Sequence, residues 1–193
     1  MLLYYILIAV VTVTTLSILS VTVLFNVSSI EIVNNEKYTD EQVIAAAGVS
    51  EGDNLVRMNT ASIEEKILEK LIYVDTASVE RHFPNKLKIV LTTADPMAEI
   101  YYDGSYYVLS YREKLLAVAD NQHHTERLVR GLEIDAQTAQ VGKILPDTED
   151  KKVELIHKIV TGLDQNKLFE KCRIDVTDTM AITILYDDRI SID

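Results

Sequence analysis

Hydrophobic and polar positions divide the chain into a charge-free start and a longer remainder with short alternating patterns. Residues 1–30 contain no Asp, Glu, Lys or Arg, and the stretch from Leu2 to Phe25 holds six polar positions, all Ser or Thr. A helix over this stretch rises about 36 Å, and the hydrocarbon core of a bilayer is about 30 Å thick. Ser and Thr can bond to the carbonyls of their own helix and so permit a span. We therefore expect residues 1–25 to form a transmembrane helix.

Two alternatives to the membrane span fit the pattern less well. A secretory signal peptide would need a basic start and a cleavage site of small residues, and residues 1–30 have neither. A buried pair of strands would need a turn, and no Gly, Pro, Asn or Asp occurs before Asn26. The pattern alone determines the orientation of the span poorly, because Lys37 is the first basic residue after it and lies among acidic ones.

The region after the span alternates apolar and polar residues in three places. The alternation predicts strands at residues 27–33, 74–81 and 86–92. Phe83-Pro84-Asn85 predicts a turn between the last two strands, since Pro fixes its own φ and restrains the residue before it.

Two helices are expected between the first and second of these strands. Thr39 and Gln42 form a capping box before a short helix at residues 40–47, and Gly48 ends that helix. A second helix begins at Asn59 or Thr60 and continues with apolar residues at helical spacing. The order strand–helix–helix–strand–strand predicts a three-stranded sheet with two helices on one face.

From Asp95-Pro96 onward the pattern is rich in strands. Asp103-Gly104 between two apolar runs is a hairpin signal. Further strands are predicted at residues 115–118, 128–134, 173–176, 180–186 and 189–192, and one helix from Asp147 or Thr148. The fold class is therefore α+β, in three parts: a transmembrane helix at 1–25, a β-α-α-β-β domain at 26–94, and a mainly antiparallel β domain with one helix at 95–193.

Composition excludes several kinds of partner. The net charge of −11 argues against binding to nucleic acid, which needs basic patches, and against docking of the domain on anionic lipid headgroups. The only cysteine, Cys172, has no partner for an internal disulfide and lies among apolar residues, so we expect it to be a small buried side chain.

Candidate catalytic or metal-binding groups do not form a convincing constellation. His123 and His124 lie near Glu126, but adjacent histidines share a metal poorly and this polar stretch is typical of a loop. Asp187-Asp188 is a turn signal rather than an acid–base pair. We expect no catalytic residue, no metal and no cofactor, and therefore a protein that is not an enzyme.

Several segments together resemble the FtsQ/DivIB family of bacterial cell-division proteins. In order along the chain, these are residues 25–32 directly after the span, 38–43, 47–49, Gly52-Asp53-Asn54-Leu55, 71–74, 79–89, 96–98, 106–109 and 128–132. The resemblance implies that residues 26–94 are a POTRA domain and that the second domain is the family's β domain. In the family this β domain usually continues past the position of Asp193, so we expect the β domain to be incomplete here.

The resemblance also implies a location and partners. It implies a single-pass protein of the cell membrane, with its N-terminus in the cytoplasm and its bulk outside, located at the division septum. It implies a scaffold that binds FtsB/DivIC-type and FtsL-type membrane proteins and is anchored in the lipid bilayer by its span. It implies neither a nucleic-acid partner nor a small-molecule substrate. The alternatives are a secretion or transport POTRA module that binds client strands, and a membrane-tethered cell-wall enzyme.

The last strands are the predicted partner-binding region. An open sheet leaves unpaired backbone groups at its edge, to which a partner strand can add. The alternation at the end of the chain places the candidate residues there, and we expect them to include both core and partner contacts: Ile182, Ile184, Tyr186 and Ile190.

Overall fold

The computed structural model describes the backbone of residues 2–121, 127–145, 150–168, 171–187 and 190–192. Within these ranges, the side chains of residues 2, 17–23, 150, 190 and 192 are not described. The described chain divides into two compact units: a first unit of residues 1–68 and 76–92, and a second unit of residues 69–75 and 93–193. The domain boundaries expected from the sequence stay predictions.

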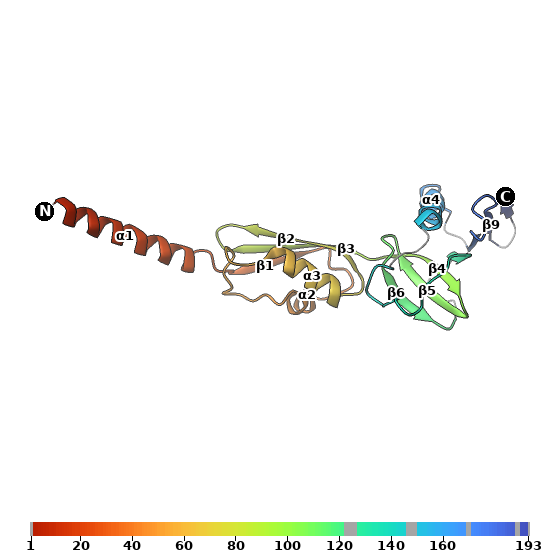
Figure 1. Cartoon of the computed structure of the whole chain (residues 1–193), viewed down its shortest axis with the longest axis horizontal. Coiled ribbons are helices and arrows are strands. Elements are labelled where there is room, and N and C mark those ends of the chain that lie inside the picture. Colours follow the sequence, from red (N-terminus) through yellow and green to blue (C-terminus); the bar gives the residue numbers. More distant parts are fainter. Residues whose placement is uncertain (1, 122–126, 146–149, 169–170, 188–189, 193) are drawn as a thin grey trace. The chain divides into compact units, whose positions relative to one another are not determined.

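The chain begins with a helix over most of the charge-free stretch. Helix α1 covers Leu2–Val23 and carries no acidic residue in its first turn and no basic residue in its last (Figure 1). Large apolar side chains of this helix are exposed, from Ile8 at 45% to Leu3 at 83%. Among the described residues, no helix is both long and apolar enough to cross a bilayer. The membrane span expected over residues 1–25 stays a prediction.

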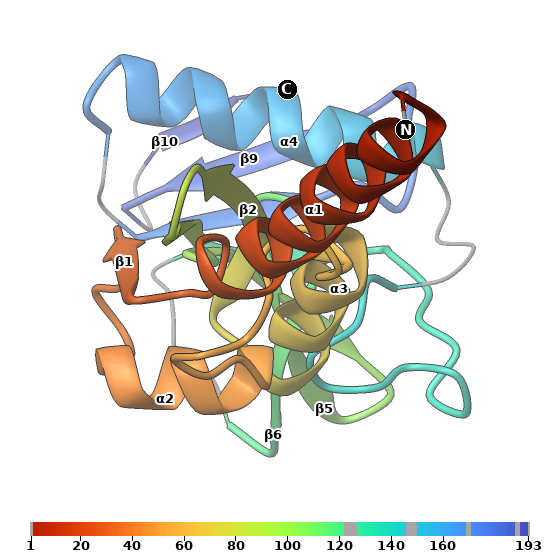
Figure 2. The ribbon, with the colours of Figure 1, turned by 90° about the vertical axis from the view of Figure 1, so that its left-hand side faces the viewer.

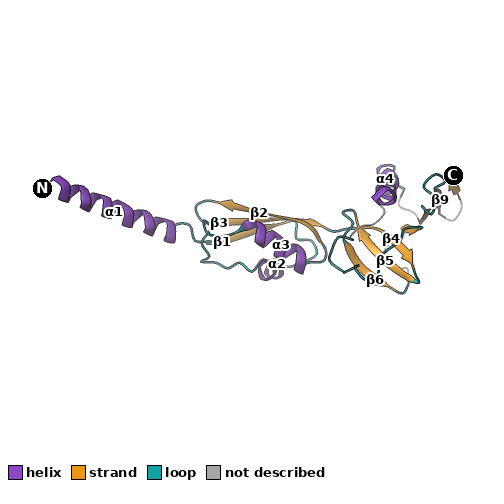
Figure 3. Ribbon diagram, viewed as in Figure 1, coloured by secondary structure: helices purple, strands orange, loops and turns teal. Residues whose placement is uncertain are grey.

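The first unit contains the expected strand–helix–helix–strand–strand order. Strand β1 (Ser29–Val33) is followed by α2 (Asp40–Ala47), α3 (Thr60–Lys70), β2 (Val74–His82) and β3 (Lys86–Thr93). The strand order is β1-β3-β2, and β1 runs parallel to β3, with Ser29 opposite Lys86 and Val33 opposite Val90. Figure 3 shows both helices on the same side of this sheet.

Local signals explain why these elements begin and end where they do. The side chain of Thr39 accepts from the backbone of Gln42, and the Gln42 side chain accepts from the backbone of Thr39 at 2.9 Å, which confirms the capping box. Gly48 has φ +65° and closes α2 in the left-handed region that favours glycine. Both helices bury apolar side chains, among them Val43 and Ile67, and Leu87, Ile89 and Leu91 of the sheet are at most 2% exposed.

The second unit is built on a seven-stranded sheet with one helix. Its elements are β4 (Pro96–Tyr102), β5 (Ser105–Ser110), β6 (Leu115–Ala119), β7 (Arg127–Arg130), α4 (Asp150–Gln165), β8 (Cys172–Asp175), β9 (Thr183–Tyr186) and β10 (Ile190–Ile192). The strand order is β10-β9-β8-β7-β4-β5-β6, and among its described strand pairs only β4–β7 and β7–β8 are parallel. The mostly antiparallel α+β prediction is confirmed, while the predicted helix start at Asp147 or Thr148 lies outside the described residues.

The core of the second unit lies between the sheet and α4. Met97, Ile100 and Val129 from the sheet and Ile156 and Val160 from α4 belong to one buried cluster, so α4 covers one sheet face (Figure 2). Cys172 is 1% exposed in the same cluster, and burial raises the pKa of its thiol, which confirms its prediction as a small buried side chain.

The prediction of a strand over residues 128–134 is wrong beyond Arg130. Strand β7 ends there because the next residue, Gly131, adopts φ +87°, which L side chains rarely adopt. A Cβ at this position would lie 2.3 Å from the backbone nitrogen of Thr177. Close passage of the segment after β8, which a pattern of apolar residues does not report, therefore leaves no room for a side chain at this position.

Candidate functional site

Three of the candidate partner-binding residues, Ile184, Tyr186 and Ile190, lie on the last two strands of the seven-stranded sheet, and Ile182 directly precedes β9. In the register of β9 and β8, Ile184 lies opposite Ile174 and Tyr186 lies opposite Cys172. Ile182, Ile184 and Tyr186 are partly buried and pack against the core cluster under α4. Ile184 and Tyr186 therefore lie on the core-facing side of β9, and Ile182, just before this strand, packs against the same cluster. The fourth candidate, Ile190, lies opposite Tyr186 in β10, and its side chain is not described.

The strand order places β10 at one end of the described sheet. Its three residues pair with β9 in antiparallel register, from Ile190 opposite Tyr186 to Ile192 opposite Ile184. The strand order ends at β10, so no further strand of the described chain lies on its outer side. A sheet edge of this kind can accept a strand from another chain, with backbone hydrogen bonds giving affinity.

The opposite face of the sheet carries a group of aromatic and basic side chains that the sequence patterns did not single out. The guanidinium of Arg130 lies 5.5 Å from the ring centroid of Tyr101, and the rings of Tyr101 and Tyr106 lie 5.1 Å apart. A small hollow of about 130 Å³ lies beside them, lined by Arg130, Arg173, Ile174, Asp175, Thr183 and Leu185. Strict alternation along β8, with Cys172 and Ile174 buried and Arg173 and Asp175 exposed, is the signal that could have found this face.

An ion pair fixes α4 to the sheet. The Arg127 guanidinium in β7 is paired with the Asp164 carboxylate in α4, and the Tyr111 hydroxyl also donates to that carboxylate. Arg127 donates a further hydrogen bond of 3.1 Å to the Tyr111 oxygen. Burial raises the pKa of Tyr111, and the hydrogen bond to Asp164 raises it further. Because these three side chains form hydrogen bonds with one another, we interpret the network as structural.

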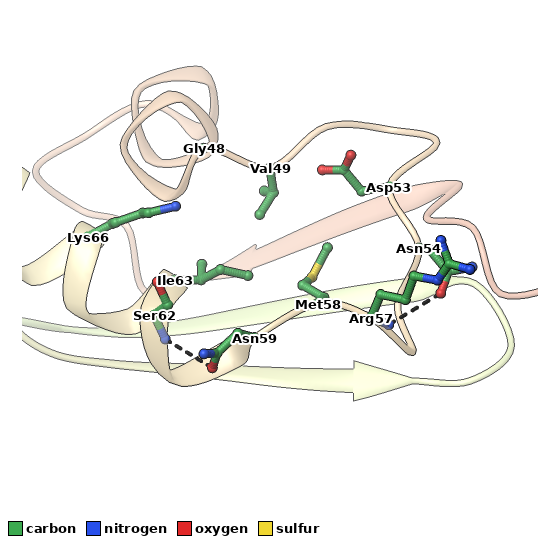
Figure 4. A pocket seen from close by; sticks show the side chains of 10 residues that line it. All are labelled: Gly48, Val49, Asp53, Asn54, Arg57, Met58, Asn59, Ser62, Ile63 and Lys66. Carbon is green, nitrogen blue, oxygen red and sulfur yellow. Dashed lines mark hydrogen bonds between the residues drawn. The ribbon is translucent and has the colours of Figure 1, made fainter.

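A hollow in the first unit lies beside the end of α2 and the start of α3. About 290 Å³ is enclosed by Gly48, Val49, Asp53, Asn54, Arg57, Met58, Asn59, Ser62, Ile63 and Lys66 (Figure 4). Two asparagine side chains of its lining accept hydrogen bonds from nearby backbone N–H groups. Asn59 Oδ1 accepts from the Ser62 backbone nitrogen at 3.3 Å, and Asn54 Oδ1 accepts from the Arg57 backbone nitrogen at 3.3 Å. The lining offers neither a pair of carboxylates nor a nucleophile beside a base, so it provides no catalytic constellation.

Metal binding finds no support in the described part of the chain, where no group of three His, Cys, Asp or Glu side chains is placed to hold an ion. His123, His124 and Glu126 lie outside the described residues, and so does Asp188. The expectation of no metal at these positions stays a prediction.

Comparison with known proteins finds one matching domain and two similar curated proteins. Residues 25–92 match the POTRA domain, FtsQ-type. The cell division protein DivIB of Clostridium tetani is 24% identical over 73% of this chain and 52% of its own length. The cell division protein FtsQ of Syntrophotalea carbinolica is 22% identical over 83% of this chain and 56% of its own length. The chain thus spans about half the length of these curated relatives.

The class of protein is therefore one in which an FtsQ-type POTRA domain is followed by a sheet-rich region. The chain contains an FtsQ-type POTRA domain and is similar to two proteins named as cell-division proteins, DivIB and FtsQ. These similarities support the resemblance to the FtsQ/DivIB family that the sequence shows.

Proposed function

We propose that the chain is a membrane-anchored scaffold of the division septum that binds FtsB/DivIC-type and FtsL-type proteins along the outer edge of β10. The single observation that carries the binding part is the position of β10 at the end of the strand order. The two relatives, both named as cell-division proteins, favour this function over a secretion or transport module.

The positions of the candidate side chains refine how this edge works. Ile182, Ile184 and Tyr186 pack against the core cluster, so they position β9 rather than meet a partner directly. The partner would then be recognised through the backbone of β10, with residues near this edge on the face opposite α4, such as the partly buried Leu185, adding side-chain contacts. Strand addition of this kind tolerates varied partner sequences, because main-chain hydrogen bonds supply most of the affinity.

Anchoring is proposed through α1. The 22 residues of this helix contain no charged side chain, and the large apolar side chains described in it are exposed. In a bilayer this exposure would be to lipid, which removes the cost of apolar surface in water. We place the N-terminus in the cytoplasm and the two units outside it.

The edge proposal is tested by placing proline at each end of the same sheet. Ile192→Pro alters the proposed docking strand β10, and Val118→Pro alters β6, the strand at the opposite end of the order. Proline removes a backbone donor and is tolerated best on edge strands, so both variants are expected to fold. The full chain in nanodiscs is mixed with an FtsB/DivIC-type ectodomain, and binding and thermal unfolding are measured.

We expect Ile192→Pro to lose at least tenfold in affinity while Val118→Pro binds like the wild type. A folded Ile192→Pro variant with unchanged affinity overturns the edge proposal. Loss of binding in the Val118→Pro variant alone would move the docking edge to β6.

A further inference from the structure

An aromatic pair joins the exit of α1 to the turn between β2 and β3. The rings of Phe25 and Phe83 lie 5.4 Å apart and perpendicular, and Phe83 is 59% exposed. Phe25 follows the end of α1 at Val23 by two residues, whereas Phe83 belongs to the turn after β2. The Ser28 backbone nitrogen also donates to the carbonyl of Asn85 at 2.8 Å. The turn is therefore held beside the point at which the chain leaves α1.

The turn also carries positive charge in an otherwise acidic chain. Residues 81–88, here called the hairpin tip, contain Arg81, Lys86 and Lys88 and no acidic residue, while the whole chain has a net charge of −11. The carboxylates of Glu31 and Glu80 lie beside side chains of the hairpin tip. Glu31 is paired with Lys86, which lowers the pKa of Glu31, and Glu80 lies 3.1 Å from His82.

We propose that the hairpin tip is a membrane-contact site for a bilayer with anionic headgroups, which rests on the proposed anchoring of α1. Phe83 enters the headgroup region beside Phe25, and the positive charge of the tip attracts the lipid phosphates. Three observations support this: the exposed aromatic ring, its contact with the residue that leaves α1, and the local reversal of charge. Aromatic side chains favour the interface, and basic side chains are attracted to an anionic surface.

Contact at the tip has a consequence for the first unit. A domain attached to the bilayer only through α1 can rotate about the connection at residues 24–28. A second attachment through Phe83 restricts that rotation and gives the first unit one preferred face toward the membrane. The net charge of −11 disfavours docking of the whole chain on anionic lipid, whereas the basic residues of the tip favour a local contact with it.

The chain contains no tryptophan, so single substitutions provide local fluorescent probes. Three full-length variants are reconstituted in phosphatidylcholine–phosphatidylglycerol vesicles with and without brominated lipid: Phe83→Trp at the tip, Val11→Trp within α1, and Met180→Trp, at a side chain that is 97% exposed in the second unit. We expect blue-shifted emission and bromine quenching for Phe83→Trp and Val11→Trp, and neither for Met180→Trp.

The outcomes separate the inference from the proposed anchoring. Quenching of Val11→Trp without quenching of Phe83→Trp overturns the tip contact and leaves the anchoring intact. Quenching of Phe83→Trp without quenching of Val11→Trp overturns the anchoring and supports the tip contact. Absence of quenching in both overturns both.

The charge component is tested in the Phe83→Trp background. Replacing Arg81 and Lys88 by Gln is expected to reduce quenching by about half in anionic vesicles and to leave it unchanged in purely zwitterionic ones. The matched control replaces Lys66 and Lys70 of α3 by Gln, which removes the same charge away from the tip. An equal effect of both pairs would contradict a specific role of the tip.

Discussion

The ammonium group of Lys114 donates a hydrogen bond of 2.7 Å to the carbonyl oxygen of Val74, although the residue is only 5% exposed. The same group donates to the carbonyl of Leu71 at 3.1 Å. Nearby, the Ser110 hydroxyl donates to the Asp75 carboxylate at 2.8 Å. Within the second unit, Lys114 therefore holds the segment of residues 69–75 against the sheet.

Replacing Lys114 by Met is expected to lower the free energy of unfolding by about 1–3 kcal/mol, because two buried carbonyls lose their donor. Chemical denaturation followed by circular dichroism measures this change. The control is Lys143→Met, at an exposed side chain of a neighbouring segment, which should change stability by less than about 0.5 kcal/mol. Equal effects of the two substitutions would show that the bonds of Lys114 contribute little.

The pH dependence of unfolding tests the same group independently. Burial lowers the pKa of Lys114 below its ordinary value of 10.5, and the Asp75 carboxylate opposes this shift in part. Between the lowered pKa and 10.5 the unfolded chain binds more protons than the folded chain, so stability from this group rises with pH. The wild type should therefore gain stability relative to Lys114→Met as pH rises through this window. A difference between the two proteins that is independent of pH would contradict the lowered pKa.

Gly131 is expected to tolerate no side chain. Gly131→Ala places a Cβ against the Thr177 backbone at φ +87°, and we expect a loss of about 2–4 kcal/mol in the free energy of unfolding. Gly104 offers a matched control, since its φ is +83° but no atom lies within 4 Å of the position that a Cβ would take. Gly104→Ala should cost about 1 kcal/mol, for the backbone conformation alone. Similar losses at both positions would exclude the contact with Thr177 as the cause.

The Arg127–Asp164 pair is expected to couple more strongly than an exposed pair. A double-mutant cycle of Arg127→Met and Asp164→Asn should give a coupling free energy of about 1–3 kcal/mol, because the two side chains are 12% and 28% exposed. The comparison cycle uses Glu154 and Lys158, which are paired on the surface of α4 at 65% and 67% exposure. That cycle should give about 0.5 kcal/mol or less. Coupling of the same size in both cycles would argue against a role of Arg127 in docking α4.

Local signals in the sequence were enough to predict the first unit. The capping box of Thr39 and Gln42, the stop at Gly48 and the turn at Phe83-Pro84-Asn85 each depend on neighbours within a few residues. The Asp103-Gly104 hairpin is confirmed for the same reason, with both residues at positive φ between β4 and β5. These features follow from backbone preferences that act before tertiary contacts form.

Long-range contacts explain what the sequence did not predict. The parallel pairing of β7 with both β4 and β8 joins segments far apart in the chain, and periodicity carries no information on such partners. Alternation placed Ile184 and Tyr186 on one face of the predicted strand, but only the position of α4 shows that this face is the core. The buried Lys114 gave no signal, because its acceptors are backbone carbonyls about forty residues away.

The most direct measurement of the central claim is the distribution of the protein in dividing cells. A fluorescent protein is fused to the N-terminus of the complete native protein and imaged with a septal marker. A division scaffold should be enriched in a band at midcell in dividing cells. A signal spread evenly around the envelope throughout division would contradict the account.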